Sequence, residues 1–375
     1  MKAPKILIVK PPLDGHDRPI YDLIKLFREH GIDPIWTGLR QPWPQIVKTA
    51  VEEDVDAVGV SVHTGDPVVL LGHLKAELDR AGFINRVLVA GGSGEITFPD
   101  VRKKLAALGF KVFLSGIQRD EIAKYILRKC KKREQMRGLI KVAEFSVPEN
   151  HFFTANQLTQ AISLLERNPK MEIKTLQHPF HTVVLCGTSG AGKSSILNRA
   201  LEYLALSGKK IGVLLCDPRG PKEKGAFLGD RLVLQDHTSN GRIFIRSFSQ
   251  FGGYTPKHTS LLKKSALLLS AWGAELIFIE TIGLAQESAA GIKNLADILA
   301  WVTLPNETDD VRLLKGGIHE IADVILLNKI DLEPWFRAEL AIKEYFHKPY
   351  FKVSAMSGKG IVEFCEYIKE KIAGS

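Results

Sequence analysis

Short apolar runs alternate with amphipathic stretches along most of the chain, and this alternation predicts a parallel α/β architecture. In the first half the apolar runs predict strands at residues 6–9, 34–36, 57–60, 87–90 and 111–114. Helical periodicity fills the intervals, for example over residues 68–81, which Gly82 then ends. Five such units in succession describe a small doubly wound, flavodoxin-like domain.

The strand pattern stops near residue 131 and resumes at residue 181. This interval is interrupted by prolines and contains one amphipathic helix at residues 157–167, which we expect to pack on the domain that follows. The sequence therefore predicts a first domain at residues 1–135, a helical linker at residues 136–180 and a second α/β domain at residues 181–375.

The composition is that of a soluble protein, since 45% of the 375 residues are hydrophobic and 25% are charged. No run reaches the roughly 18 apolar residues that a membrane span needs, and the apolar run near the N-terminus is too short for a signal-peptide core. The cysteines lack the spacing of a disulfide framework or a metal site; they are Cys130, Cys186, Cys216 and Cys365. We therefore expect a cytoplasmic protein, in a reducing compartment, whose cysteines are buried.

The formal net charge of +9 raises the question of nucleic-acid binding. The densest basic run, residues 128–133, falls at a predicted helix end, where cations complement the helix dipole, and no aromatic residues are interleaved with it. We therefore expect no nucleic-acid partner. A mild positive excess also suits polyanionic small ligands such as nucleotides and coenzyme A esters.

A phosphate-binding loop follows the predicted strand at residues 182–186 and precedes a helical run at residues 194–205. Its glycines allow successive backbone N–H groups to turn toward phosphate oxygens, and the helix N-terminus adds positive potential. Lys193 would reach the β- and γ-phosphates as a catalytic residue, and the Ser194 hydroxyl would bind Mg²⁺. The predicted nucleotide-binding residues of this loop are Gly187, Thr188, Ser189, Gly190, Ala191, Gly192, Lys193, Ser194 and Ser195.

Two later strand ends predict that the base is guanine. The strand at residues 324–327 leads into Asn328, Lys329 and Asp331, and the Asp331 carboxylate can accept hydrogen bonds from the N1–H and 2-amino groups of guanine. Adenine would leave this carboxylate facing an acceptor, at a cost on the order of 1–3 kcal/mol per lost bond. The strand at residues 350–353 leads into a loop placed to contact the guanine edge, formed by Ser354, Ala355 and Met356.

Carboxylates near other strand ends are candidate Mg²⁺ ligands. Asp217 and Glu280 each follow an apolar strand, and Asp230 lies in a short loop between them. A carboxylate at the C-terminal end of a strand, facing a phosphate loop, is placed to hold Mg²⁺ or its water, so we predict that these three residues join Ser194 at the metal. Gln286 is a candidate for orienting the attacking water, although an exposed polar loop residue is an equally good interpretation. Glu280 and Gln286 are thus the further catalytic candidates.

The second half resembles the GTPase family that serves as chaperone of methylmalonyl-CoA mutase, over about residues 155–372. The segments that carry the resemblance are residues 187–195, 217–218, 228–230, 244–246, 280–286 and 315–323. It implies that Asp217, Asp230 and Glu280 surround Mg²⁺, that residues 305–315 form a mobile switch reporting the nucleotide state to the mutase, and that the protein is a homodimer. Residues 218–221 depart from the family pattern, which usually has serines after the proline.

In the first half, three motifs follow predicted strands, at the edge where a doubly wound sheet binds its ligands. Asp14 and His16 follow the first strand, Ser61 the third, and Gly91 and Gly92 the fourth. Taken separately, a loop histidine is usually solvated and a glycine pair after a strand is usually a turn. Together their spacing resembles the cobalamin-binding domain of acyl-CoA mutases, over about residues 3–130.

This second resemblance implies a role for each motif. His16 would be the lower axial ligand of cobalt, with Asp14 hydrogen-bonded to its other ring nitrogen. Ser61 would contact the displaced dimethylbenzimidazole, and Gly91 and Gly92 would let the nucleotide tail pass close to the backbone. The cofactor implied is adenosylcobalamin.

Two positions depart from the mutase signature. Pro19 stands where the signature has glycine, and it fixes φ in the loop that carries His16. His63 replaces a leucine and places a polar ring where an apolar wall is expected. The domain starts at its first strand, without the helical cap of corrinoid methyltransferase proteins, which favours the mutase type.

We therefore predict a GTPase joined to a B12-binding domain that supports cofactor loading, protection or function of an adenosylcobalamin-dependent acyl-CoA mutase. The catalytic barrel of such a mutase needs about 250 residues, so we expect it on another chain as the large subunit, with the first half as a candidate small subunit. A cobalamin carrier or transfer protein, and a GTPase with a vestigial B12 domain, remain open. The absence of a cysteine–histidine cluster disfavours a metallochaperone for another metal enzyme.

Overall fold

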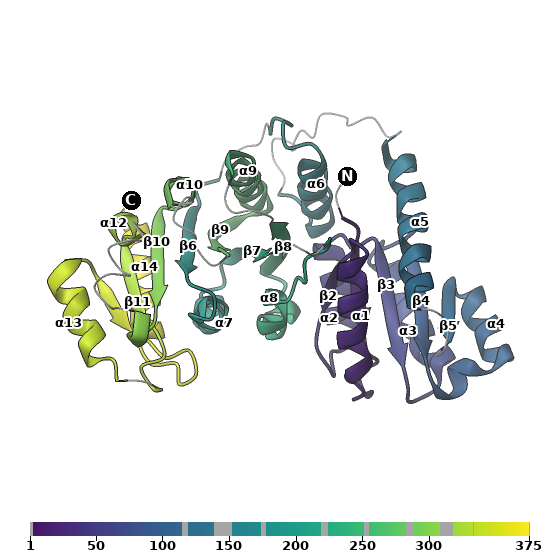
Figure 1. Ribbon diagram of the computed structural model, residues 1–375. Helices are drawn as coiled ribbons and strands as arrows, with labels where there is room; N and C mark the ends of the chain where they lie inside the picture. The colour runs from purple at the N-terminus through teal and green to yellow at the C-terminus, as the bar shows by residue number, and fades with distance from the viewer. Residues whose placement is uncertain are drawn as a thin grey trace. The chain divides into compact units, whose positions relative to one another are not determined.

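The computed structural model describes residues 3–114, 119–138, 152–173, 178–218, 224–250, 255–282, 289–307, 318–332 and 334–374. The chain divides into two compact units. The first contains Met1–Phe145 together with Asp217–Ser239, and the second contains Ser146–Cys216 together with Asn240–Ser375. Each unit is built around one β-sheet with helices packed on it (Figure 1).

The first unit has a five-stranded parallel sheet in the order β2-β1-β3-β4-β5. Its strands are β1 (Lys5–Val9), β2 (Asp33–Trp36), β3 (Ala57–Val62), β4 (Val87–Gly92) and β5 (Phe110–Leu114). Its helices are α1 (Arg18–Glu29), α2 (Trp43–Glu52), α3 (Pro67–Arg80), η1 (Gly94–Thr97), α4 (Pro99–Ala107) and α5 (Arg119–Gly138). All the strands predicted for this half are therefore present, with bounds close to those expected.

Both faces of this sheet are covered, because successive strand residues point to opposite sides. On one face Ile6 and Ile8 of β1 pack with apolar residues of α1 and α5. On the other face Leu7 and Val9 pack with apolar residues of α2, α3 and α4. The sheet is therefore doubly wound, and the carboxyl ends of its strands lie at one shared edge.

A stretch from the second half of the sequence belongs to the first unit, namely Asp217–Ser239. It includes α8 (Asp230–Val233) and η3 (Gln235–Ser239). Ala226 and Leu228 are fully buried in the same apolar cluster as residues of α2, α3 and α4. Leu228 also forms a parallel bridge to Ile35 of the edge strand β2. The expected domain range of 181–375 included this stretch, and the burial of its apolar residues against the first sheet accounts for the difference.

The second unit has a seven-stranded sheet in the order β12-β11-β10-β6-β9-β7-β8. Its strands are β6 (His181–Gly187), β7 (Lys210–Pro218), β8 (Ile243–Gln250), β9 (Ala274–Glu280), β10 (Ile298–Thr303), β11 (Val324–Leu327) and β12 (Tyr350–Lys352). Its helices are α6 (Ala155–Arg167), α7 (Lys193–Leu204), η2 (Ala205–Ser207), α9 (Pro256–Trp272), α10 (Ala289–Lys293), η5 (Pro305–Glu307), α12 (Ile318–Ile321), α13 (Phe336–Tyr345) and α14 (Ile361–Ala373). Neighbouring strands from β12 to β7 pair in parallel, so their carboxyl ends also share one edge.

The helix predicted between the two domains, α6, packs on α9 of the second unit as expected. It begins with a capping box, in which Thr154 and Gln157 exchange side-chain and backbone hydrogen bonds. Arg246 of β8 is fully buried, donates from Nη2 to Oγ of Ser163 at 2.9 Å and pairs with Glu166. These contacts fix α6 on the second unit.

Helix α5 is longer than the sequence pattern indicated. It extends to Gly138, so the basic run at residues 128–133 lies within the helix and not at its end. Within the described parts of the chain, no helix has the length and apolar character needed to cross a membrane.

Candidate functional site

The phosphate loop lies between β6 and α7 of the second unit. Gly187, the last residue of β6, and Gly192, the residue before α7, have positive φ angles of 148° and 90°. A Cβ at Gly187 would lie 2.1 Å from the carbonyl oxygen of Val302, and a Cβ at Gly192 would lie 2.4 Å from Nδ2 of Asn328. Both positions therefore require glycine, and the turn that they allow brings the loop to the N-terminus of α7.

The Lys193 side chain folds back over this loop. It is buried, and its Nζ donates to the carbonyl oxygens of Gly187 at 3.2 Å and Thr188 at 3.1 Å. The ammonium group is thus held inside the turn, where phosphate oxygens can serve as acceptors in place of the carbonyls. The exposed residues of the loop are Thr188, Ser189, Gly190 and Ser195.

Two of the predicted Mg²⁺ ligands, one at the start of α7 and one at the end of β9, are in contact. Oγ of Ser194, in the first turn of α7, donates to Oε1 of Glu280 at 2.6 Å. Glu280 is the last residue of β9 and is buried. A hydroxyl and a carboxylate in contact beside a phosphate loop are the hard oxygen donors that Mg²⁺ prefers, so these residues fit the ion.

The other two predicted Mg²⁺ ligands belong to the first unit. Oδ1 of Asp217 accepts hydrogen bonds from the backbone N–H groups of Gly229 at 2.9 Å and Asp230 at 3.1 Å. Asp217 therefore fixes the turn that leads into α8. Gln286 and the predicted switch beyond residue 307 lie outside the described residues.

Asn328 joins the predicted base-recognition segment to the phosphate loop. The side chain is buried; its Nδ2 donates to the carbonyl oxygen of Ala191 at 2.8 Å, and its Oδ1 accepts from the N–H of Ala355 at 3.4 Å. Lys329 has a left-handed φ of 59°, which turns the chain after β11. Asp331 is exposed, as a residue that binds a base must be before the base arrives.

Arg199 of α7 was not singled out from the sequence. Its Nε donates to the carbonyl oxygen of Ala355 at 3.0 Å and its Nη2 to that of Met356 at 3.2 Å. Ser354 is fully buried, and its Oγ accepts from the N–H of Ser357 at 3.1 Å. Arg199 thus holds the backbone of the second base-recognition loop in place. An arginine on a helix carries no sequence signal that distinguishes this role.

In the first unit, Asp14 is the centre of a hydrogen-bond network around His16. Asp14 is fully buried; its Oδ1 lies 2.8 Å from Nδ1 of His16, and its Oδ2 accepts from the N–H of His63 at 2.7 Å. Burial alone would raise the pKa of Asp14, but hydrogen bonds from His16, Lys10 and His63 lower it to about 2. The carboxylate is therefore ionised at neutral pH. Because it binds Nδ1 of the 60% exposed His16 ring, Nε2 is the nitrogen presented to a metal.

Lys10 is a second residue that the sequence did not reveal. It is buried, and its Nζ donates to Oδ2 of Asp14 at 3.0 Å and to the carbonyl oxygen of Ser61 at 3.1 Å. Burial lowers the pKa of Lys10, while the Asp14 carboxylate opposes that shift. The network Lys10–Asp14–His16 therefore orients the imidazole from inside the sheet.

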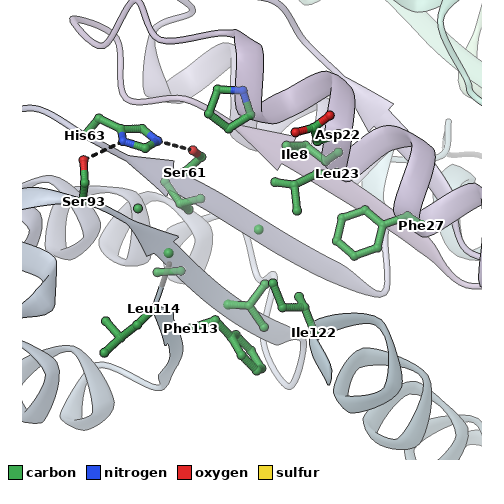
Figure 2. Close-up of a pocket in the computed structure, with 17 residues that line it drawn as sticks. Ile8, Asp22, Leu23, Phe27, Ser61, His63, Ser93, Phe113, Leu114 and Ile122 are labelled. Carbon is green, nitrogen blue, oxygen red and sulfur yellow. Dashed lines mark hydrogen bonds between the residues drawn. The ribbon is translucent and has the colours of Figure 1, made fainter. Parts of the chain in front are cut away.

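A cavity of about 500 Å³ opens beside this network (Figure 2). His63 lies at one end of it, with Nε2 3.3 Å from Oγ of Ser61 and Nδ1 2.8 Å from Oγ of Ser93. Burial and the Lys10 charge lower the pKa of His63, which favours the neutral ring. Most of the remaining wall is apolar, and Pro19 contributes to it; labelled members in Figure 2 are Ile8, Leu23, Phe27, Phe113, Leu114 and Ile122.

The two predicted glycines line the same cavity. A Cβ at Gly91 would lie 2.8 Å from the carbonyl oxygen of Phe113, and one at Gly92 would lie 1.7 Å from that of Val62. The neighbouring strands β5 and β3 therefore already require glycine here. The absence of side chains also leaves backbone exposed to whatever fills the cavity.

A phosphate loop and an Asn-Lys-x-Asp segment, joined by Asn328 at the carboxyl edge of a parallel sheet, define a P-loop GTP-binding protein. Comparison with protein families agrees. The family model described as "Methylmalonyl Co-A mutase-associated GTPase MeaB" matches residues 158–373, more than half of the chain. The chain belongs to this family, and the family's description agrees with the predicted enzyme class, a GTPase.

Individual relatives fall into two kinds. A protein of Pyrococcus horikoshii named as a GTPase is 36% identical over 205 residues, which are 51% of this chain and 63% of that protein. The fused isobutyryl-CoA mutases of Nocardia farcinica and Geobacillus kaustophilus are 25% and 24% identical over 334 and 365 residues. These alignments cover 85% and 90% of this chain but 30% and 32% of the mutases. The chain thus spans less than two thirds of the length of these relatives.

Among solved structures, an LAO/AO transport system kinase aligns with a TM-score of 0.44 and 21% identity, over 57% of this chain and 70% of that one.

Proposed function

We propose that this chain binds cobalamin and hydrolyses GTP as a chaperone of an adenosylcobalamin-dependent acyl-CoA mutase. The observation that carries the proposal is the Lys10–Asp14–His16 network beside a largely apolar cavity, in a member of a mutase-associated GTPase family. As a chaperone it would load the cofactor into the mutase, protect the cofactor or support turnover.

The second unit would bind GTP through the groups already described. Lys193 and the backbone N–H groups of the loop bind the β- and γ-phosphate oxygens, and Asp331 accepts from guanine. Mg²⁺, when bound, neutralises charge on the phosphates; Ser194 and Glu280 hold it, with Asp217 and Asp230 as further ligands on the sequence pattern. Gln286 is proposed, from the sequence alone, to orient the water that attacks the γ-phosphate.

The first unit would hold cobalamin at the carboxyl edge of its sheet, whose strand order is that of flavodoxin-like folds. His16 presents Nε2 to cobalt, and Asp14 keeps Nδ1 protonated and the ring oriented. The cavity beside Ser61 is within the size range of small-molecule sites and would take the displaced benzimidazole. Gly91 and Gly92 would allow the nucleotide tail to lie against backbone. Cobalt in this cofactor supplies the homolytic chemistry of the partner mutase.

The fused mutases support the choice of partner. Their alignments cover most of this chain, so both of its halves have counterparts within single mutase polypeptides. We therefore infer that the large subunit of an acyl-CoA mutase is the partner of both halves. A homodimer in the cytoplasm is proposed from the family resemblance.

The test is a spectroscopic titration of the full-length protein with cobalamin. We expect saturable binding with a spectrum in which a histidine replaces benzimidazole on cobalt, and its loss in His16→Ala. His73→Ala, an exposed histidine of α3, is the matched control and should bind normally. In parallel, GTP turnover is measured with and without a mutase large subunit, with Lys193→Ala as the inactive control. A protein that binds no cobalamin contradicts the proposal and leaves a GTPase with a vestigial domain.

A further inference from the structure

One wall of the cavity in the first unit is polar and consists of Ser61, His63 and Ser93. Nε2 of His63 lies 3.3 Å from Oγ of Ser61, and Nδ1 of His63 lies 2.8 Å from Oγ of Ser93 (Figure 2). At the buried end, Nζ of Lys10 donates to Oγ of Ser61 at 3.4 Å. Ser93, at the other end, is exposed. This polar wall therefore runs from the interior of the unit to its surface.

The other walls of the cavity are largely apolar. They include Ile8 of β1, Phe27 of α1, Phe113 of β5 and Ile122 of α5. Such walls pack on the faces of any flat aromatic ring and do not distinguish one ring from another of similar size. Asp22 of α1 also lines the cavity, but it is exposed, so water screens its charge. Discrimination between ring systems is therefore left to the polar wall.

The polar wall can both donate and accept hydrogen bonds. Burial and the Lys10 charge lower the pKa of His63 and favour its neutral ring, in which one nitrogen donates and the other accepts. When Nε2 of His63 donates to Ser61, the hydroxyl proton of Ser61 is free for a ligand. When Ser61 instead donates to Nε2, a lone pair of Ser61 is left for a ligand donor. The wall thus matches a ligand edge of either kind.

An apolar side chain at position 63 would remove this capacity. The mutase signature that the first half resembles has leucine here, which neither donates nor accepts. The bond between His63 and Asp14, at 2.7 Å, comes from the backbone N–H of His63 and does not depend on its side chain. The ring centroids of His63 and His16 are 5.3 Å apart, so the polar wall begins beside the proposed cobalt ligand. The His63 side chain is therefore placed to act on the nucleotide of a corrinoid.

We propose that His63 shifts the preference of this site toward corrinoids whose lower base has a polar edge, as a purine has, and away from dimethylbenzimidazole, whose outer edge carries methyl groups. This inference rests on the proposed binding of cobalamin by the first unit. A purine exchanges hydrogen bonds with the polar wall, whereas methyl groups displace water from the wall and give nothing in return. A site with polar groups discriminates against a ligand that leaves them unpaired.

The test is a spectroscopic titration of the full-length protein with three corrinoids. They are cobalamin, its analogue with adenine as the lower base, and cobinamide, which lacks the nucleotide. The measured quantity is the affinity for the adenine analogue divided by that for cobalamin. His63→Leu should lower this ratio by about 3-fold to 10-fold, the effect of about one net hydrogen bond. The affinity for cobinamide should not change, because cobinamide has no base.

Two further variants separate hydrogen bonding from shape and from folding. His63→Gln keeps a donor and an acceptor and should retain most of the wild-type ratio. Ser93→Ala shortens the polar wall at its exposed end and should lower the ratio in the same direction as His63→Leu. Melting temperatures identify the folded variants, and Ser93→Ala keeps the test decisive if His63→Leu does not fold. His73→Leu, the same substitution at an exposed position of α3, is the matched control.

The outcomes distinguish this inference from the proposed function. If the wild type binds cobalamin and the ratio is unchanged in folded His63→Leu and Ser93→Ala, the proposed function stands and the inference is wrong. An equal loss of affinity for cobinamide in His63→Leu also overturns the inference, because His63 would then act through His16 and not through the base. If the wild type binds none of the three corrinoids, the proposed function is wrong and the inference falls with it.

Discussion

Nδ2 of Asn328 donates to the carbonyl oxygen of Ala191 at 2.8 Å, so one buried side chain links the segment that reads the base to the loop that binds the phosphates. The same side chain accepts from the N–H of Ala355. Base recognition and phosphate binding therefore share a structural element. A substitution that disrupts this element should weaken the binding of both the base and the phosphates.

Replacing Asn328 with alanine should weaken GTP and GDP alike. The change leaves the Ala191 carbonyl and the Ala355 N–H without this partner, and an unsatisfied buried group costs about 1–3 kcal/mol, or about tenfold to 100-fold in affinity. Isothermal titration with both nucleotides measures the loss. Asn198→Ala, which removes a partly exposed asparagine of α7, is the control. A loss confined to GTP would contradict a shared element.

Replacing Asp331 with asparagine should change the base that is preferred. The amide can donate to the 2-oxo group of xanthine but can no longer accept from both donors of guanine. We expect GTP affinity to fall by about 1–3 kcal/mol per lost hydrogen bond and xanthosine triphosphate to bind better than to the wild type. Competition binding with GTP, xanthosine triphosphate and ATP measures this order. Equal wild-type affinity for ATP and GTP would refute the guanine assignment.

Arg199→Ala should raise the KM for GTP more than it lowers kcat. The guanidinium donates to the carbonyl oxygens of Ala355 and Met356, both in the second base-recognition loop. Losing two charge-assisted bonds to this loop should cost about 1.5–3 kcal/mol in nucleotide affinity. Glu202→Ala removes the other partner of Arg199, at 2.9 Å, and leaves the loop bonds intact. Steady-state kinetics should therefore show a near wild-type KM for Glu202→Ala; a shared defect would point to general damage of α7.

Lys10→Met should weaken cobalamin binding, although Lys10 would act on the cofactor only through Asp14 and His16. The substitution leaves the buried Asp14 carboxylate without its lysine partner, so the imidazole of His16 is held less firmly. Partners of this kind typically contribute about 10-fold to 100-fold in metal affinity. Lys111→Met, at an exposed position of β5, is the matched control in the same spectroscopic titration. Wild-type affinity in Lys10→Met would mean that Asp14 alone orients the ring.

The cysteines should resist thiol reagents in the native protein. Cys130, Cys186, Cys216 and Cys365 are all buried and none is in a disulfide, and burial raises the pKa of Cys186 and of Cys365 to about 12. The reactive thiolate is therefore scarce at neutral pH as well as inaccessible. Titration with a chromogenic disulfide should detect no thiol in the native state and all of them in denaturant. Rapid labelling of the native protein would contradict the buried environment.

Local sequence patterns were sufficient for the sheets and for the phosphate loop. The sequence of residues 187–194 predicts the conformation of the phosphate loop, because the glycines that the turn requires lie close together in the chain. The pairing of Asp14 with His16 follows similarly from a spacing of two residues. In both cases the information is local.

Long-range contacts could not be predicted in this way. The bridge from Arg231 to Glu52 and Glu53 joins residues far apart in the chain, and each of them reads as an ordinary surface charge. Lys10 and Arg199 were missed for the same reason: their functional partners are set by the packing of strands and helices. Sequence patterns locate groups that act together locally, whereas supporting residues become visible only in the folded chain.

The bridge between Leu228 and Ile35 limits where the gene could be divided without damage to the first unit. Strand β2 lies at the edge of its sheet, and an uncovered edge strand is a template for aggregation. A gene divided anywhere between residues 136 and 180 would separate β2 from Leu228, and Glu52 and Glu53 from Arg231. Recombination within residues 136–180 should therefore yield an aggregation-prone product, so evolution is expected to keep both halves in one reading frame.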